Sequence, residues 1–156
     1  MTGLAQLIKK ARNANRPQDM VDAMPYCGYL GLRAAAEGDD LIVTLPFDDG
    51  LVGNPVISAL HGGVTGGALE STAILKLLWA RDSADLPKII NITIEYLRSP
   101  RPIDTFARAV ITKMGRRVAS VRVEAWQQER QKQIAIANTH FLLIPPQAGR
   151  SNEQTL

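Results

Sequence analysis

The residues of this sequence that could do chemistry are one acid, one histidine and the glycines between them. Glu70 is the single formal charge in residues 50–75, and His61 lies nine residues before it. A carboxylate in so apolar a stretch must be partly desolvated, which costs on the order of several kcal/mol unless a partner or a shifted pKa offsets it. Glu70 is therefore the first candidate for a functional side chain.

The glycines predict that something approaches the backbone closely at the start of a helix. Glycines stand at positions 62, 63, 66 and 67, and each costs about 1 kcal/mol relative to alanine inside a helix. A ligand or a strand could require them. The first turn of a helix has unpaired N–H groups, and Gly62 and Gly63 have no side chain to keep a polarised oxygen away. Helical spacing puts Glu70 on the same side as Gly63 and Gly67, so donors and a carboxylate share one groove.

The stretch 51–81 must contain the element that positions this groove. From Gly62 onward small and apolar residues recur on every side, which is typical of a helix buried all round. Before it, residues 30–36 and 41–46 flank a polar turn and predict a hairpin. Alternation and short links predict four further antiparallel strands, at residues 88–98, 105–114, 117–127 and 132–144. The count is six strands and one long helix, and an antiparallel sheet can bury that helix only by curling around it.

The two ends of the chain are predicted to lie outside this arrangement. Residues 1–24 carry apolar side chains at helical spacing, which predicts an N-terminal helical segment packed on the domain as a lid. Such a segment is too short to be a persuasive DNA-binding domain. The domain itself spans residues 25–144. The polar tail, 145–156, begins with two prolines that end the last strand, and we assign it no function.

Composition limits the kind of protein. A chain of 156 residues with 46% hydrophobic content suits one domain with a real core. The net charge of +3 is modest and the basic residues are scattered, so nucleic-acid binding is not indicated. The lone Cys27 excludes an intrachain disulfide framework, and no apolar run reaches the ~18 residues that a membrane span needs. We expect a soluble cytoplasmic protein with no membrane partner.

Several motifs together resemble the PaaI-type acyl-CoA thioesterases of the hotdog fold. The resemblance rests on His-Gly-Gly at 61–63 followed by an acid nine residues after the histidine, and it extends over residues 25–144. Its other motifs are residues 25–32, Asn54-Pro55, the strand at 91–98 and the hairpin around 115–117. The resemblance implies an α+β hotdog fold, with a six-stranded antiparallel sheet wrapped around one long central helix. It also implies a homodimer or a homotetramer, a dimer of dimers, with the active site between subunits.

The resemblance also implies roles for individual residues. Glu70 would act on the thioester as nucleophile or as the general base for water, the alternative being an acid held by structural hydrogen bonds. The N–H of Gly62 would polarise the thioester carbonyl, unless Gly62 serves close packing alone. His61 could fix the loop or touch the substrate. Asn54 resembles a loop amide that holds water or the carbonyl from the neighbouring subunit, although it lies one residue further from His61 than in relatives.

Another departure follows the acid. Several relatives have a hydroxyl residue four positions beyond it, where this chain has Ile74. Hydroxyl assistance would therefore come from elsewhere or be absent, which leaves room for a member that binds acyl-CoA without rapid turnover.

Coenzyme A would enter as part of the substrate, so its phosphates need cations. Arg98, Arg101, Arg116 and Arg117 lie at predicted strand ends and in a hairpin, where guanidinium groups could bind phosphate. Arg116 and Arg117 are the first to test, and Gly63 is expected to contact the same moiety. No metal or redox cofactor is expected. Cys27 is interpreted as a small apolar side chain and not as a nucleophile.

The function expected from these residues is hydrolysis of an acyl-CoA thioester to the free acid and CoA. One alternative is a hotdog 3-hydroxyacyl-CoA dehydratase or enoyl-CoA hydratase. Others are a non-catalytic acyl-CoA-binding protein and a purely structural subunit that binds no CoA. Aromatic, medium-chain and branched acyl groups all suit a groove lined by Val, Leu and Ile, so the sequence leaves the acyl group open.

Overall fold

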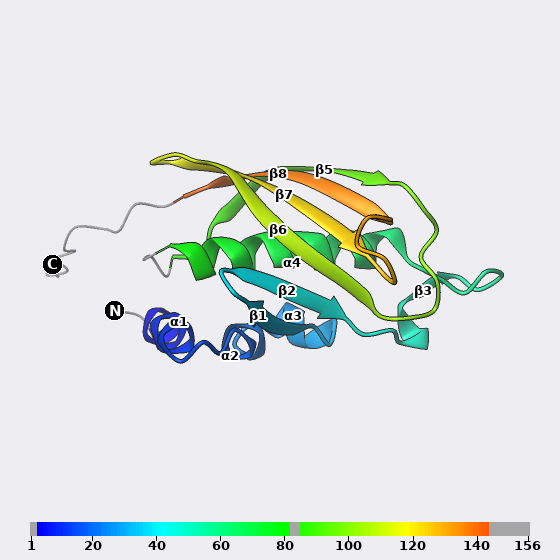
Figure 1. Cartoon of the computed structure of the whole chain (residues 1–156), viewed down its shortest axis with the longest axis horizontal. Helices are drawn as coiled ribbons and strands as arrows, with labels where there is room; N and C mark the ends of the chain where they lie inside the picture. Colours follow the sequence, from blue (N-terminus) through cyan, green and yellow to red (C-terminus); the bar gives the residue numbers. More distant parts are fainter. Residues whose placement is uncertain (1–2, 82–84, 144–156) are drawn as a thin grey trace, which may run out of the picture.

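A long helix, α4 (Gly62–Ala80), lies against a curved six-stranded antiparallel sheet in the computed structural model, which describes residues 3–81 and 85–143 (Figure 1). The strand order in the sheet is β1-β2-β6-β7-β8-β5, so β1 and β5 form its edges. The strands are β1 (Arg33–Glu37), β2 (Asp40–Leu45), β5 (Lys88–Tyr96), β6 (Thr105–Met114), β7 (Val118–Trp126) and β8 (Ala135–Leu142). This helix wrapped by an antiparallel sheet is the hotdog arrangement, and it confirms the expected fold.

The central helix is buried on two sides because two apolar clusters meet on it. Leu69, Ala73 and Leu77 pack against alanines and valines of the sheet, while Leu75 and Leu78 pack with the N-terminal segment. This explains the absence of a single apolar stripe in its sequence. No helix in the ranges that the structure describes is long and apolar enough to span a membrane.

The predicted strands agree with the structure to within a few residues. The β1–β2 hairpin turns at Gly38, whose φ of 60° lies in the left-handed region that favours glycine. The last strand begins at Ala135, later than the predicted residue 132, and residue 144 lies outside the described residues. The structure adds a pair that the sequence did not predict, β3 (Val52–Asn54) with β4 (Ala59–Leu60), preceded by a 3-10 turn, η1 (Asp49–Leu51). Two strands this short contain too few residues to show alternation.

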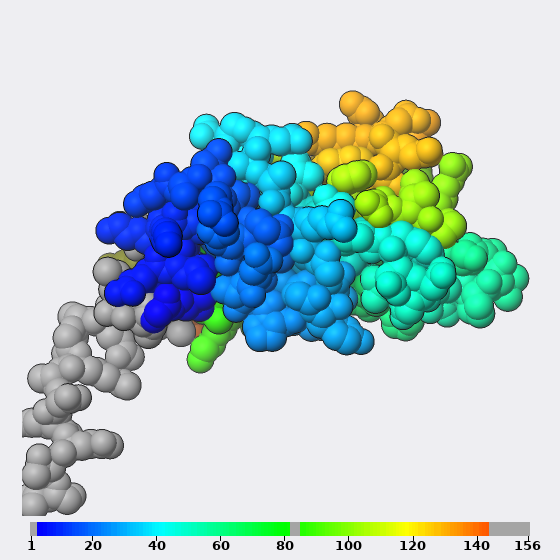
Figure 2. Space-filling model, turned by 90° about the horizontal axis from the view of Figure 1, so that it is seen from below, coloured from blue at the N-terminus to red at the C-terminus, as the bar shows by residue number. Residues whose placement is uncertain are grey.

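The N-terminal segment, described from residue 3 to residue 24, contains α1 (Gly3–Asn13) and α2 (Gln18–Asp22), and a third short helix, α3 (Pro25–Tyr29), opens the domain that follows. Ile8, Ala11 and Met20 are fully buried in the same cluster as the central helix. Seen from below, these helices, in blue, cover part of the face (Figure 2). The segment therefore shares its core with the domain. The predicted tail at 145–156 lies outside the described part of the chain.

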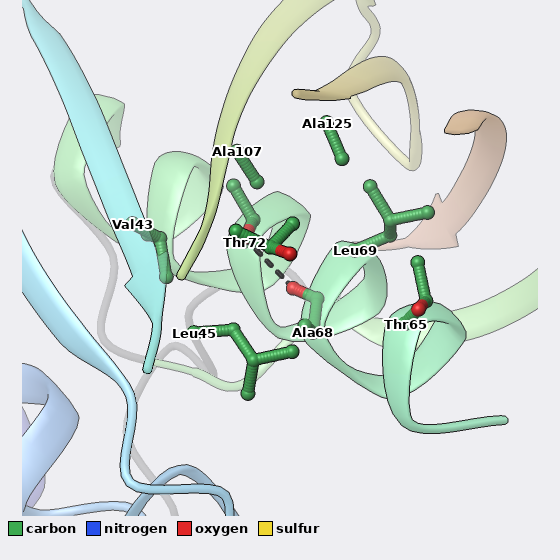
Figure 3. Close-up of a pocket in the computed structure, with 9 residues that line it drawn as sticks. Val43, Leu45, Thr65, Ala68, Leu69, Thr72, Ala107 and Ala125 are labelled. Carbon is green, nitrogen blue, oxygen red and sulfur yellow. Dashed lines mark hydrogen bonds between the residues drawn. The ribbon is translucent and has the colours of Figure 1, made fainter. Parts of the chain in front are cut away.

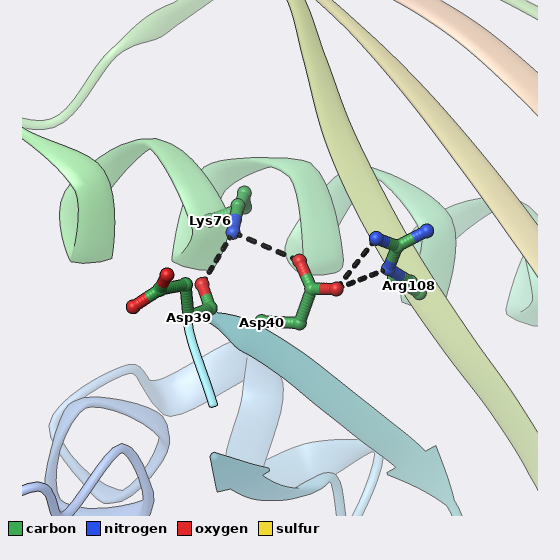
Figure 4. Close-up of polar contacts among 4 residues, drawn as sticks. All are labelled: Asp39, Asp40, Lys76 and Arg108. Carbon is green, nitrogen blue, oxygen red and sulfur yellow. Dashed lines mark hydrogen bonds and ion pairs between the residues drawn. The ribbon is translucent and has the colours of Figure 1, made fainter. Parts of the chain in front are cut away.

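A carboxylate joins the central helix to two strands. Asp40 accepts a hydrogen bond from Arg108 Nε at 2.8 Å and pairs with Lys76 Nζ at 3.3 Å, and Lys76 also donates to the Asp39 carbonyl at 2.9 Å (Figure 4). The Arg108 guanidinium, helped by Lys76, lowers the pKa of Asp40 despite partial burial. This network links α4, β2 and β6.

Asp40→Asn is expected to lower the free energy of unfolding by about 1 kcal/mol at neutral pH, since the Asp40 side chain is 31% exposed and its pairs are partly screened. The folded pKa of Asp40 is depressed, so the stabilisation is present above the unfolded value of ~3.9 and is lost as pH falls through the folded value. Urea unfolding at neutral and acidic pH should show parent and variant converging in acid. A constant difference would contradict the ion-pair origin.

Candidate active site

The first turn of α4 leaves one backbone donor without an acceptor. The side chain of His61 caps the helix, because its Nδ1 accepts the N–H of Gly63 at 2.9 Å. The carbonyl of His61 accepts from Val64 and Thr65 at 3.0 and 3.1 Å. Among the described residues, nothing accepts the N–H of Gly62. The carbonyl oxygen of that same His61–Gly62 peptide therefore accepts two hydrogen bonds, which fix the plane of the peptide and polarise its free N–H.

The neighbouring carbonyl is held by a strand. Tyr96 Oη, on β5, donates to the carbonyl of Gly62 at 2.7 Å. A Cβ at Gly66 would lie 2.9 Å from Cδ1 of Ile94, also on β5, whereas a Cβ at Gly62 would meet Tyr96 at an ordinary 3.4 Å. A strand therefore accounts for Gly66, but not for the glycine at 62.

A groove runs along the other side of the same helix. We call it the Glu70 groove: its volume is about 550 Å³, and its α4 wall consists of Gly63, Gly67, Glu70, Ser71 and Ile74. Tyr26 of α3 lies over Gly67, where an added Cβ would come within 2.5 Å of its hydroxyl. The groove is therefore of the size of a small-molecule site and includes the first turn of α4.

Glu70 projects into this groove without a partner. It is half-buried, and in the part of the chain that the structure describes it makes neither a hydrogen bond nor an ion pair. Gly62 precedes it by eight residues, about 12 Å along the axis, and helical side chains lean toward the N-terminus, which shortens the gap. The free N–H belongs to the first turn of α4, whose next residue, Gly63, lines the groove together with Glu70.

The interior of the domain contains a cavity much smaller than the Glu70 groove. A second cavity lies between α4 and strands β2, β6 and β7, but its volume is only about 10 Å³ (Figure 3). Its threonines include Thr72, whose Oγ1 donates to the carbonyl of Ala68 at 2.7 Å. Such a space holds at most one water molecule. Of these two cavities, only the Glu70 groove is large enough for a small-molecule ligand.

The structure does not bring Asn54 to Glu70 within one chain. Asn54 is exposed at the end of β3, in the hairpin that projects beyond the start of α4 (Figure 1). Its Oδ1 accepts the N–H of Val56 at 3.1 Å, a local turn bond. Any part that it plays at an active site stays a prediction and would require a second subunit.

The predicted cations divide between the two ends of the sheet. Arg98 follows β5 just beyond Tyr96, so it lies at the same end as Gly62, and its guanidinium bonds to the carbonyl of Gln133. Arg116 and Arg117 form the β6–β7 turn, and the register aligns the neighbouring Val118 with Leu142 and Lys88 at the opposite end. Eight residues of strand separate the ends, about 26 Å. Within one chain, Arg116 and Arg117 lie far from the free N–H.

Sequence reasoning missed the two tyrosines. Tyr26 and Tyr96 belong to motifs that support the resemblance, but neither was singled out as a site residue. The signal for Tyr96 was its place in the alternating series of β5, on the side of Ile92 and Ile94, which pack toward the core. Tyr26 had no comparable signal, because α3 was not predicted.

The remaining titratable candidates are structural. Burial raises the pKa of the Cys27 thiol, although a hydrogen bond with Ser71 opposes this, so Cys27 stays protonated. Among the described residues, no group of three His, Cys, Asp or Glu side chains is placed to hold a metal ion.

Comparisons with known proteins agree with this architecture. The sequence model of the thioesterase superfamily matches residues 58–134. A crystal structure of a protein from Chromobacterium violaceum is 41% identical, with 89% of this chain and 97% of that chain covered and a TM-score of 0.73. No protein with a curated description matches the sequence.

Two more distant structures share the fold. The Escherichia coli PaaI protein, from the phenylacetic acid degradation operon, is 16% identical over 91% of this chain and 96% of its own, with a TM-score of 0.70. A thioesterase from Haemophilus influenzae is 22% identical over 81% and 87%, with a TM-score of 0.71. The chain belongs to the thioesterase superfamily.

Proposed function

We propose that this protein is an acyl-CoA thioesterase, which hydrolyses an acyl-CoA to the free acid and CoA. The observation that carries the proposal is the unpartnered, half-buried carboxylate of Glu70 in a groove that includes the helix turn bearing the free Gly62 N–H. A thioester needs these two groups: a donor for the oxygen that becomes negative, and a base or nucleophile for the carbonyl carbon. The proposal needs no metal or redox cofactor.

The reaction can follow either of two routes. The carbonyl oxygen accepts the N–H of Gly62, and the positive end of the α4 dipole stabilises the oxyanion. In one route Glu70 takes a proton from water as the water attacks, and the C–S bond then breaks to release CoA. In the other, the carboxylate attacks the carbonyl and expels CoA thiolate, and water hydrolyses the resulting anhydride. Both consume one water and yield one acid and one thiol.

The dehydratase alternative fits less well. It requires a second acid–base group on the substrate, and His61 is the histidine at this end of α4. His61 Nδ1 is occupied by the N–H of Gly63, and the ring is part of the helix cap. This supports a structural role for His61, worth about 1 kcal/mol as other caps are.

A thiol-release assay over a panel of aliphatic and aromatic acyl-CoAs tests the proposal. We expect turnover of at least one substrate. A 3-hydroxyacyl-CoA in the panel should yield free thiol and no enoyl product; the reverse would support the dehydratase. A thermal shift with CoA but no turnover would support a non-catalytic binding protein.

We further propose that the chain forms a homodimer through β5 and that this dimer completes the site. Within the described residues β5 pairs only with β8, so its outer edge has unpaired backbone groups, and the side chains of Ile90 and Tyr96 are 56% and 55% exposed. Proteins normally cover such an edge. A two-fold axis beside β5 would turn the partner end for end, which would allow a partner's Asn54 or arginines to approach the groove.

Ile90→Lys should weaken this dimer, because two charges would be placed at the edge-to-edge contact. Sedimentation velocity should show the parent as a dimer or larger and the variant shifted toward the monomer. Met114→Lys is the matched control, since Met114 is 44% exposed in the β6–β7 turn region, away from the β5 edge. A monomeric parent would contradict the proposal.

A further inference from the structure

Most of the wall of the Glu70 groove opposite α4 comes from the N-terminal segment and α3, and Leu86 completes the lining. Leu4 of α1 lines it, and so do Met24, which precedes α3, and Pro25, the first residue of α3. Leu4 and Met24 also pack on the buried cluster that contains Ile8 and Leu75. This wall is therefore supported by the core and is part of the folded domain.

Most side chains of the N-terminal wall are apolar, namely those of Leu4, Ala23, Met24 and Pro25, while Tyr26 adds a hydroxyl and Cys27 a thiol on the side near α4. The N–H of Met24 donates to the carbonyl of Val21 at 3.0 Å, and the Met24 carbonyl accepts from Gly28 at 3.1 Å. Pro25 has no N–H. The pantetheine arm of CoA carries two amides, and burying an amide without a partner costs on the order of 1–3 kcal/mol. This wall suits hydrocarbon and disfavours pantetheine.

The charge of the groove further limits which acyl groups it can bind. Among the described residues, Glu70 is the only acid that lines the groove, and no Lys or Arg lines it. An acyl group with a second carboxylate would meet like charge and no partner there. Ile74 lies one turn beyond Glu70, about 6 Å toward the C-terminal end of α4, so the hydrocarbon would run from the carbonyl past Ile74 toward α1.

We propose that the N-terminal segment forms the acyl-binding end of the groove and that Leu4 and Met24 limit the length of the acyl group. This inference rests on the proposed function. The substrate class is an uncharged, apolar acyl group of short to medium length. Residues 1–24, which the sequence suggested as a lid, would then determine specificity.

The test is the chain-length profile of kcat/KM, measured from acetyl-CoA to palmitoyl-CoA. Leu4→Trp fills the end of the groove and should lower kcat/KM for the longest accepted substrate at least tenfold relative to a shorter one, since a single methylene is worth roughly 10- to 200-fold in a tight pocket. Leu4→Ala should extend the profile to longer chains. Gln6→Trp is the matched control, because Gln6 is exposed on the same helix and does not line the groove.

The outcomes separate this inference from the proposed function. No thiol release from any substrate by the parent would overturn the function itself. Turnover by the parent with identical profiles for Leu4→Trp and Gln6→Trp would overturn the inference alone. If Leu4→Trp fails to fold, Leu4→Ala decides: a longer optimum supports the acyl assignment and an unchanged profile overturns it. Titration of alkyl-CoA thioethers into Glu70→Gln and into Glu70→Gln with Leu4→Ala should show the same length preference without turnover.

Discussion

Replacing Glu70 by glutamine is expected to lower kcat for thiol release about a thousandfold. General acid–base groups contribute roughly 10² to 10⁴ in rate, and among the described residues Glu70 is the only carboxylate that lines its groove, where burial raises the pKa of the neighbouring Cys27 thiol. Glutamine keeps the shape of the side chain but can neither accept a proton from water nor attack the carbonyl. A continuous assay of released CoA, with the substrate that the panel selects, measures the loss.

The stability of the same variant distinguishes function from structure. Glu70 forms no hydrogen bond or ion pair within the described residues, so neutralising it should leave the free energy of unfolding unchanged or slightly higher. Glu37→Gln is the control, since Glu37 is an exposed acid on β1, at the opposite edge of the sheet from β5. A Glu70→Gln variant that remains active but loses stability would identify a structural acid and end the catalytic proposal.

The fold could be predicted because its signals are local and repeated. The long uncharged run around Glu70 has the length of one helix, and the alternation in residues 88–98 and 117–127 continues for enough residues to define strands. Where a signal was brief, prediction failed: β3 and β4 are too short for a period, and α3 is a five-residue helix within a motif that was recognised but not assigned to an element.

The sequence predicted the reactive groups of the site, but it did not predict the residues from other elements that surround them. The identity of Glu70 and its distance from the glycines follow from helical spacing, which sequence alone supplies. The placement of Tyr96 on the Gly62 carbonyl and of Leu4 in the groove depends on packing between residues 34 and 66 positions apart along the chain. The separation of Arg98 from Arg116 and Arg117 likewise depends on which end of the sheet each turn occupies, and this emerges only from strand order and register.

A proline at position 62 would remove the Gly62 N–H with little other change to the helix. Gly62 is the first residue of α4, where proline is well accepted, because its N–H has no helical acceptor and its fixed φ suits a helix. His61 has φ −63° and ψ 134°, an extended conformation that can precede proline. Gly62→Pro should therefore fold, with a melting temperature close to that of the parent, yet lower kcat by roughly 10² to 10³, the range observed when one oxyanion donor is lost.

Gly62→Ala is the matched control for this substitution. It keeps the N–H, and its Cβ would contact Tyr96 at 3.4 Å, an ordinary van der Waals distance, so activity should stay within a few-fold of the parent. The comparison of the two variants separates the effect of losing the N–H donor from the effect of adding a side chain at position 62. If proline and alanine lower kcat equally, the volume added at Gly62 accounts for the loss. A loss confined to proline locates the oxyanion at the start of α4, because only proline removes the N–H and puts the Cδ of its ring in place of that hydrogen.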